Sequence, residues 1–144
     1  PEVNVIADEL TLNHVNPQNV DGVNVIKLFD TINSRIELLL DRNHMIGQAM
    51  FMAVRNADDI IRIIQDKIVP LMEEYFFNDL QKIQMVFNDL DESGELRENA
   101  IYMHSILSAD SYFDFVGDYL ILDKKRYFIN PNITVTSIRH IYGE

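Results

Sequence analysis

The densest group of chemically capable side chains in this sequence lies between Asp41 and Gln48, in the stretch "DRNHMIGQ". An aspartate, an arginine and a histidine within four positions can form ion pairs, bind an anion or hold a loop in shape. Apolar residues flank the stretch on both sides. The pattern predicts one helix that ends near Leu40 and a second that begins at Gly47, with the charged loop between them.

A second candidate is the stretch "DLDESGELRENA", residues 89–100, which resembles a calcium-binding loop. Asp89, Asp91 and Ser93 stand at loop positions one, three and five, and Gly94 stands at the sharp turn. The twelfth position is Ala100, where such a loop carries a bidentate glutamate. We therefore treat the first three residues as a weak metal-site candidate and expect an acidic turn between helices.

Other catalytic patterns are missing from the sequence. The five glycines stand alone, so there is no glycine-rich phosphate loop, and no serine–histidine–aspartate set can be recognised. The four histidines lack metal-ligand spacing, and the absence of cysteine excludes disulfides and cysteine-ligated metals. We expect no complete active site and no hydrolytic activity from this chain alone.

Apolar positions at spacings of three and four predict the helices that hold these residues. The predicted ranges are 22–40, 47–54, 57–75 and 79–87. Asp21, Asn56 and Asn78 are the expected N-caps, and Pro70 is expected to kink or split the third helix. Amphipathic helices joined by loops of a few residues pack as a small antiparallel bundle.

The two ends of the chain follow different patterns. The first twenty residues show no sustained period, and we expect a connector with one short helical turn. Residues 99–107 predict one more helix, 118–131 predict two short strands around a turn at 123–125, and 136–143 predict a terminal helical turn stopped by Gly143. The predicted fold is mainly α: a small helical bundle with a short C-terminal β-hairpin extension.

Composition narrows the classes of partner. The chain of 144 residues has 12 basic and 23 acidic side chains and a net charge of −11, which opposes binding to nucleic acid by this chain itself. No apolar stretch is long enough to span a membrane, and no secretory signal is visible, so we expect a cytoplasmic location and no membrane partner. Because the chain begins with Pro1 rather than methionine, we expect it to be part of a longer protein.

Two sequence blocks carry a family resemblance. "INSRIELLLDRNHMIGQAMF" and "KIVPLMEEYFFNDLQKI" resemble the C-terminal lid of McrB-type AAA+ proteins, the nucleotide-hydrolysing motor subunits of modified-cytosine restriction systems. The family pattern runs roughly Asn-x-Arg-Ile-x-x-Leu-Leu-Asp-Arg-x-His-x-Ile-Gly-His-x-x-Phe, followed by Pro-Leu-x-x-Glu-Tyr-Phe-x-x-Asp-x-x-Lys-Ile. The matching positions are Asn33, Arg35, Ile36, Leu39, Leu40, Asp41, Arg42, His44, Ile46, Gly47, Phe51, Pro70, Leu71, Glu74, Tyr75, Phe76, Asp79, Lys82 and Ile83.

The resemblance implies roles for the charged loop. In AAA+ lids a glycine opens the helix that carries a nucleotide sensor, so the sensor candidates are Arg42, His44, Gly47 and Gln48. By the same resemblance, the residues that organise the loop are Asn33, Arg35 and Asp41. The family pattern has histidine where this chain has Gln48, which carries no charge, so Arg42 is the preferred cation. A local Asp41–Arg42 ion pair is the simpler alternative.

The resemblance also implies partners and a division of the chain. Residues 1–20 would connect to an AAA+ core, 21–90 would form the lid, and 91–144 would form a C-terminal extension. GTP or ATP with Mg²⁺ would bind only in the full-length protein, which is expected to prefer GTP. Neighbouring subunits of a ring oligomer and an McrC-like nuclease subunit would be partners, and DNA would bind only through other domains.

Two other functions are compatible with the same residues. The apolar helix faces could serve a stand-alone helical protein-interaction module. The acidic stretch at 89–94 could serve a weak divalent-ion-binding helical protein. Nucleotide turnover reconstituted by adding a separately made AAA+ core would count against the interaction module, and a thermal melt that calcium does not shift would exclude the ion-binding protein.

Overall fold

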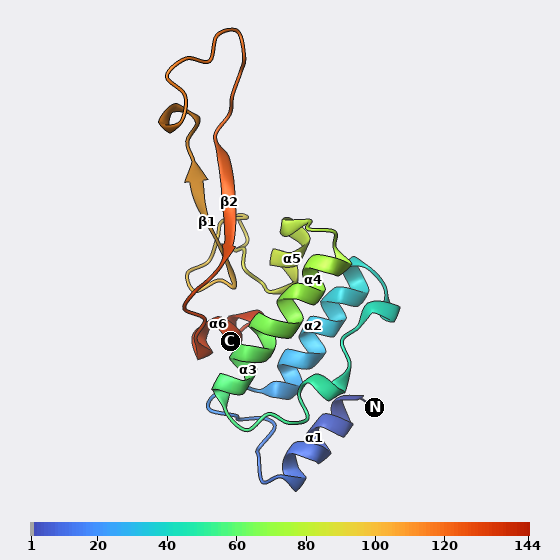
Figure 1. Ribbon diagram of the computed structural model, residues 1–144. Coiled ribbons are helices and arrows are strands. Elements are labelled where there is room, and N and C mark those ends of the chain that lie inside the picture. Colours follow the sequence, from blue (N-terminus) through green and yellow to red (C-terminus); the bar gives the residue numbers. More distant parts are fainter. Residues whose placement is uncertain (1) are drawn as a thin grey trace.

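The computed structural model describes residues 2–144, which form a helical body and a projecting β-hairpin (Figure 1). The helices are α1 (Glu2–Leu12), α2 (Val25–Leu39), α3 (Ala57–Ile63), α4 (Val69–Tyr75), α5 (Leu80–Val86) and α6 (Val135–Ile141). The strands are β1 (Tyr102–Leu107) and β2 (Lys124–Ile129), and the short helical turns are η1 (Arg42–His44), η2 (Gln48–Met50), η3 (Ile64–Ile68) and η4 (Ala109–Ser111). The predicted mainly α architecture with a C-terminal hairpin is confirmed. In the part of the chain described, no helix has the length and apolarity needed to cross a membrane.

The hydrophobic core surrounds α2, which contacts α1, α5 and α6. Its apolar residues Val25, Leu28, Phe29, Ile32 and Ile36 recur at three and four positions and are buried, as the periodicity predicts, whereas Leu38 is exposed. The rings of Phe29 and Phe51 meet edge to face at 5.9 Å between centroids, which fastens the loop after α2 onto that helix. The predicted bundle is therefore organised around its first long helix.

The N-terminal segment is more ordered than the sequence predicts. Instead of a connector with one helical turn, it forms the eleven-residue helix α1, and Ile6 and Leu10 enter the core. These two residues are four positions apart and share one helix face, whereas Val5 and Leu12 are exposed. Docking on the body stabilises a helix whose irregular apolar pattern does not predict one. The domain boundaries at 20/21 and 90/91 remain predictions from the sequence.

Helices α3 and α4 form one continuous rod, joined by the π-helical turn η3 (Figure 1). The N–H of Val69 donates to the carbonyl of Ile64, five residues earlier. This wider turn precedes Pro70, which has no N–H to donate. The proline is therefore accommodated by a local change in hydrogen bonding and does not split the helix.

Two of the predicted N-caps are wrong, one by three residues and the other by one. Asn24, not Asp21, caps α2, and Asp79, not Asn78, caps α5. Asp21 instead accepts a hydrogen bond from the N–H of Ala57 at 2.9 Å, so it joins the start of α2 to the start of α3. Asn56 caps α3 as predicted.

The predicted helix at 47–54 is also wrong. Only the short turn η2 is helical there, and the remainder is loop. Phe51 and Val54 are buried beneath this loop. The apolar character that suggested a helix therefore reflects burial of an irregular segment.

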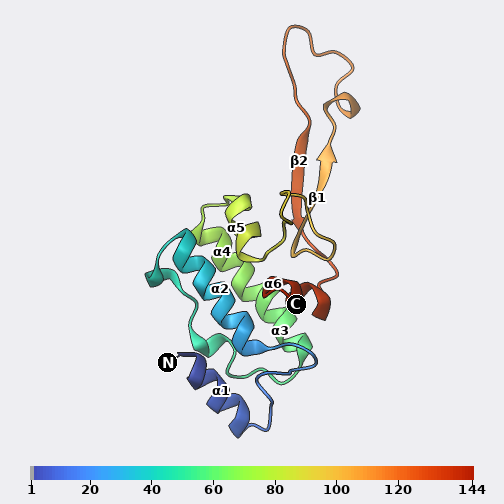
Figure 2. The ribbon, with the colours of Figure 1, turned by 180° about the vertical axis from the view of Figure 1, so that it is seen from behind.

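The C-terminal hairpin is longer than predicted and has a different first strand. Residues 99–107, expected to be helical, supply β1, which pairs antiparallel with β2 from Tyr102–Ile129 to Leu107–Lys124. We call residues 102–129 the arm and residues 108–123 its tip. Figures 1 and 2 show the arm projecting away from the helical body. A short apolar run does not by itself distinguish a strand from a helix. The strand that pairs with β1 follows only after the sixteen residues 108–123, so the pairing cannot be recognised locally.

The chain returns from the arm to the body through α6. Thr134 and Ser137 form a capping box at its start, and Gly143, with φ of +84°, follows its end. The predicted terminal helical turn is confirmed and extends over seven residues. Ile138 and Ile141 are fully buried, so the helix after the arm is part of the core.

Candidate functional site

The charged loop after α2 is held by Asn33, a buried side chain of that helix. Its amide nitrogen donates to the carbonyl of Ile46 at 3.0 Å, and its amide oxygen accepts the N–H of Ile46 at 2.6 Å. Both polar groups of one backbone unit are therefore satisfied by one side chain inside the core. This pair of bonds fixes the path of the loop at Ile46.

Asp41 organises the other end of the loop. Its carboxylate caps η1, accepting the N–H of Asn43 at 2.8 Å and that of His44 at 3.1 Å. The same oxygen lies 2.7 Å from Nδ1 of His44. The hydrogen bond with the His44 side chain is the largest cause that lowers the pKa of Asp41, so this carboxylate stays ionised. The imidazole also packs edge to face on Tyr75 at 4.9 Å between centroids.

Arg42 has a different environment from its neighbours. Its side chain is exposed, and Asp41 forms its ion pair with His44 and not with Arg42. Among the residues that the structure describes, no carboxylate pairs with Arg42. The loop therefore presents a cation to solvent from a backbone that Asp41 and Asn33 hold at both ends.

Gly47 and Gln48 begin the turn η2. Gly47 has extended backbone angles, φ −82° and ψ 152°, and a Cβ built there would meet nothing within 4 Å. Nothing in the described part of the chain therefore requires glycine at this position. The expected close approach to a neighbouring core is not made within this chain, and Gln48 is half-buried at the first position of the turn.

Arg35 does not organise the loop, contrary to the sequence-based expectation. Its guanidinium donates to the carbonyl of Val86 at 2.9 Å and to the carbonyl of Ile141. These are the last residues of α5 and α6, where the helix dipoles favour a cation. Burial lowers the pKa of Arg35. The side chain joins two helix C-termini to α2.

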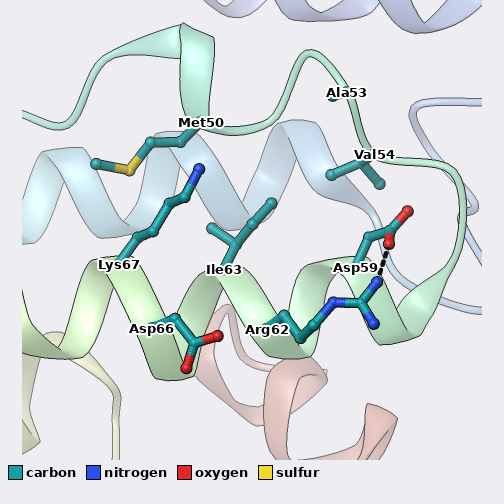
Figure 3. A pocket seen from close by; sticks show the side chains of 8 residues that line it. All are labelled: Met50, Ala53, Val54, Asp59, Arg62, Ile63, Asp66 and Lys67. Carbon is teal, nitrogen blue, oxygen red and sulfur yellow. Dashed lines mark hydrogen bonds and ion pairs between the residues drawn. The ribbon is translucent and has the colours of Figure 1, made fainter.

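A pocket that the sequence does not predict lies between residues 50–54 and the rod formed by α3 and η3 (Figure 3). It encloses about 310 Å³ and has an apolar floor that includes Met50, Val54 and Ile63. Figure 3 shows the side chain of Lys67 reaching toward Met50, while Arg62 pairs with Asp59. The lining residues are Met50, Ala53, Val54, Asp59, Arg62, Ile63, Asp66 and Lys67.

The charged residues that line this pocket follow a helical spacing in the sequence. Asp59, Arg62 and Asp66 recur at spacings of three and four and therefore share a helix face, and Lys67 lies four positions after Ile63 at its edge. What the sequence does not show is that residues 50–54 run alongside that face. The pocket depends on the irregular segment that was expected to be helical.

The acidic turn at 89–94 does not gather metal ligands. Asp89 is buried, and its two oxygens accept the N–H groups of Ile101 and Tyr102 at 2.8 Å each. Asp91 instead caps its own turn, accepting from Ser93 and Glu95. In the described residues no group of three histidines or carboxylates could hold an ion. The weak metal candidate is corrected to a structural turn in which Asp89 anchors the base of the arm.

Residues 24–84 match the family model of the McrB alpha-helical lid domain. This segment is similar to the lid of McrB-type proteins. The suggested family resemblance is confirmed over these residues, and no curated protein gives a significant match to the chain.

The boundaries of the match divide the candidate residues. The Asn33–Ile46 contact, Arg42, His44 and the pocket all lie inside the lid. Helix α1, Asp89, the arm and α6 lie outside it. The match to this lid domain implies association with an AAA+ core in an McrB-like context.

Proposed function

We propose that this chain is the lid of an McrB-like AAA+ nucleoside triphosphatase and closes over the nucleotide bound to its core. The core supplies the phosphate loop and the Mg²⁺ site, neither of which has a motif in this sequence. GTP is the preferred substrate, with ATP as the alternative. The lid converts the difference between nucleotide states into a rigid-body movement.

The observation that carries this proposal is a loop inside the matched segment that side-chain hydrogen bonds fix and that exposes Arg42. The side chains of Asn33 and Asp41 hold the loop backbone, while Arg42 is exposed and forms no ion pair in the described chain. An arginine held in this way loses little freedom when it meets a phosphate. We propose that Arg42 faces the nucleotide or the adjacent subunit and that Gln48 contributes an uncharged hydrogen bond.

The proposal includes the wider assembly. The lid contacts the next subunit of a ring, and the motor passes its nucleotide state to an McrC-like nuclease subunit in a cytoplasmic restriction system. DNA contact belongs to other domains, because the net charge of −11 on this chain opposes it.

The test is nucleotide turnover of the protein that carries both the core and this lid. Arg42→Ala is expected to lower hydrolysis about tenfold, the loss of one charge-assisted contact worth about 1.4 kcal/mol in the transition state. Folding is expected to be unchanged, because the side chain is exposed and forms no bond within the described chain.

Lys82→Ala is the matched control, since it removes an exposed cation from a different element of the matched segment, the helix α5. Turnover of this control is expected to equal that of the unmodified protein. Unchanged turnover in Arg42→Ala would show that Arg42 does not act at the nucleotide site. Equal losses of turnover in both variants would show that the effect comes from the change in net charge.

A further inference from the structure

The tip of the arm exposes more apolar surface than any other part of the molecule that the structure describes. Phe115, Tyr119 and Leu120 are 84%, 80% and 85% exposed. The arm that carries these side chains projects away from the helical body (Figures 1 and 2). A contiguous apolar surface of this kind marks an interaction site.

Charge is divided sharply along the arm. The tip carries four aspartates and no basic residue: Asp110, Asp114, Asp118 and Asp123. The next three positions are Lys124, Lys125 and Arg126, all exposed on β2. One arm therefore has an acidic apolar end and a basic stem immediately below it.

A groove lies at the junction of tip and stem. It encloses about 360 Å³, and its apolar wall includes Leu107, Tyr112 and Ile121. Lys124 and Arg126 line it as well, because alternate residues of a strand share one face. An apolar cavity of roughly 150 Å³ already accepts a benzene ring, so this groove has room for an aromatic side chain.

We propose that the occupant of this groove is the arm tip of a second copy of the chain. Two arms lie antiparallel, so that Phe115 and Leu120 of each tip pack in the groove of the other arm. Asp114 and Asp118 then meet Lys124 and Arg126 of the second copy. The contact is self-complementary, since each arm supplies both an acidic apolar tip and a basic apolar groove.

The charge of the tip argues against two other ways of covering its apolar side chains. Direct tip-to-tip contact brings four aspartates of each copy together, which is repulsive. An anionic membrane repels the same aspartates, and a neutral bilayer gives no compensation for their desolvation. The antiparallel pairing is the arrangement that offsets the tip charge with groups of the chain itself.

Sedimentation velocity of the chain over a wide range of concentration tests this pairing. The unmodified chain is expected to form dimers as concentration rises, and Phe115→Ser with Leu120→Ser is expected to raise the dissociation constant at least about tenfold, which corresponds to about 1.4 kcal/mol. These side chains are exposed, so the circular dichroism spectrum and the melting temperature are expected to stay the same.

Charge reversal supplies the decisive comparison. Asp114→Lys with Asp118→Lys puts lysines at the tip positions that meet Lys124 and Arg126, and Lys124→Glu with Arg126→Glu puts glutamates at the stem positions that meet Asp114 and Asp118. Each double variant alone is expected to stay monomeric. An equimolar mixture of the two is expected to form heterodimers, because each tip then faces a stem of opposite charge.

Several outcomes overturn the proposal. They are a chain that stays monomeric at every concentration, a charge-reversed variant that dimerises as well as the unmodified chain, and a mixture that fails to associate. Monomeric chain that binds phosphatidylcholine vesicles through Phe115 and Leu120 also overturns it and assigns the tip to a membrane surface. Tip residues required only for binding to a separate protein likewise exclude a second copy as the occupant.

Discussion

At the scale of single residues, the loop depends most on Asn33. Replacing it with leucine leaves the N–H and C=O of Ile46 without partners in the core. We expect a loss of about 2–3 kcal/mol in the free energy of unfolding, the typical cost of unsatisfied buried polar groups. Urea denaturation measures it.

Ser34→Ala is the control for Asn33, because Ser34 is the next residue of α2 and is exposed. It is expected to change stability by less than about 0.5 kcal/mol. A loss below that value in Asn33→Leu would contradict the assigned role of the side chain.

Asp89 gives the arm base a dependence on pH. Burial raises its pKa to about 6, although hydrogen bonds from Tyr102 and Ile101 oppose the shift. Because the ordinary value in an unfolded chain is about 3.9, the folded state binds the proton more tightly. The stability that protonation adds is therefore fully present below about pH 4 and is lost as pH rises through 6.

The prediction for Asp89 is a comparison with Asp89→Asn at pH 5 and pH 7. From pH 7 to pH 5 the unmodified chain is expected to gain about 1 kcal/mol of unfolding free energy relative to the variant. Chemical denaturation at the two pH values measures the difference. A difference that is the same at both would show that Asp89 does not titrate in this range.

The sequence predicts individual residues well where they contact their own neighbourhood. Asn56 caps α3 as the sequence predicts, and Asp41, assigned to the loop by the resemblance, accepts N–H groups only two and three residues away. Arg35 was misassigned because its two acceptors lie 51 and 106 positions away in the chain. The structural role of Asp89 does not follow from its neighbours for a related reason. The N–H groups that its carboxylate accepts belong to Ile101 and Tyr102, at the start of β1.

At the scale of elements, α6 is fastened to the body by Arg35. We expect Arg35→Met to speed hydrogen exchange of the α6 amides, because the variant leaves the carbonyls of Val86 and Ile141 without this donor. Exchange measured by mass spectrometry on peptides from 133–144 reports the change.

Lys27→Ala is the comparison for Arg35. Its ammonium pairs with Glu144 at 3.1 Å, also next to α6, but both side chains are exposed. Exposed ion pairs contribute little to stability. Equal exchange rates in the two variants would contradict the distinct role of Arg35.

The accuracy of the predicted elements follows from their periodicity. Helices α2 and α3 have sustained apolar stripes, and the structure confirms them. Helix α1 and the loop at 47–54 lack such stripes, and contacts with distant residues decide their conformation. Strand β1 depends on pairing with β2, which no local pattern encodes.

At the scale of the whole molecule, the arm and the helical body separate cleanly. Residues 105–126 contribute one buried side chain, Ala109, which lies in the tip and not in the core around α2. Replacing them with a two-residue Asn-Gly turn is therefore expected to leave the body folded. The melting temperature is expected to change by no more than a few degrees.

Replacing residues 101–130 is the matching control for the shorter deletion. This change also removes Ile101 and Tyr102 from the core and the amides that Asp89 binds. It is expected to destabilise the body strongly. A shorter deletion that unfolds the body would show that the arm is not an independent extension.

The sequence predicts that a hairpin exists but not where it extends. The lid and the core could be predicted because their apolar residues are periodic and their loop carries a recognisable pattern. The direction of the arm, the groove on it and the pocket beside α3 arise from contacts between distant segments. Only the folded chain brings these residues together.

The central claim is that the loop at 41–48 closes over nucleotide, and hydrogen exchange of the protein with its AAA+ core tests it most directly. A non-hydrolysable GTP or ATP analogue with Mg²⁺ is expected to slow exchange in peptides covering 41–50 and to leave the arm at 102–129 unchanged. Arg42→Ala is expected to reduce that protection. Exchange in the loop that is the same with and without bound nucleotide would contradict the account.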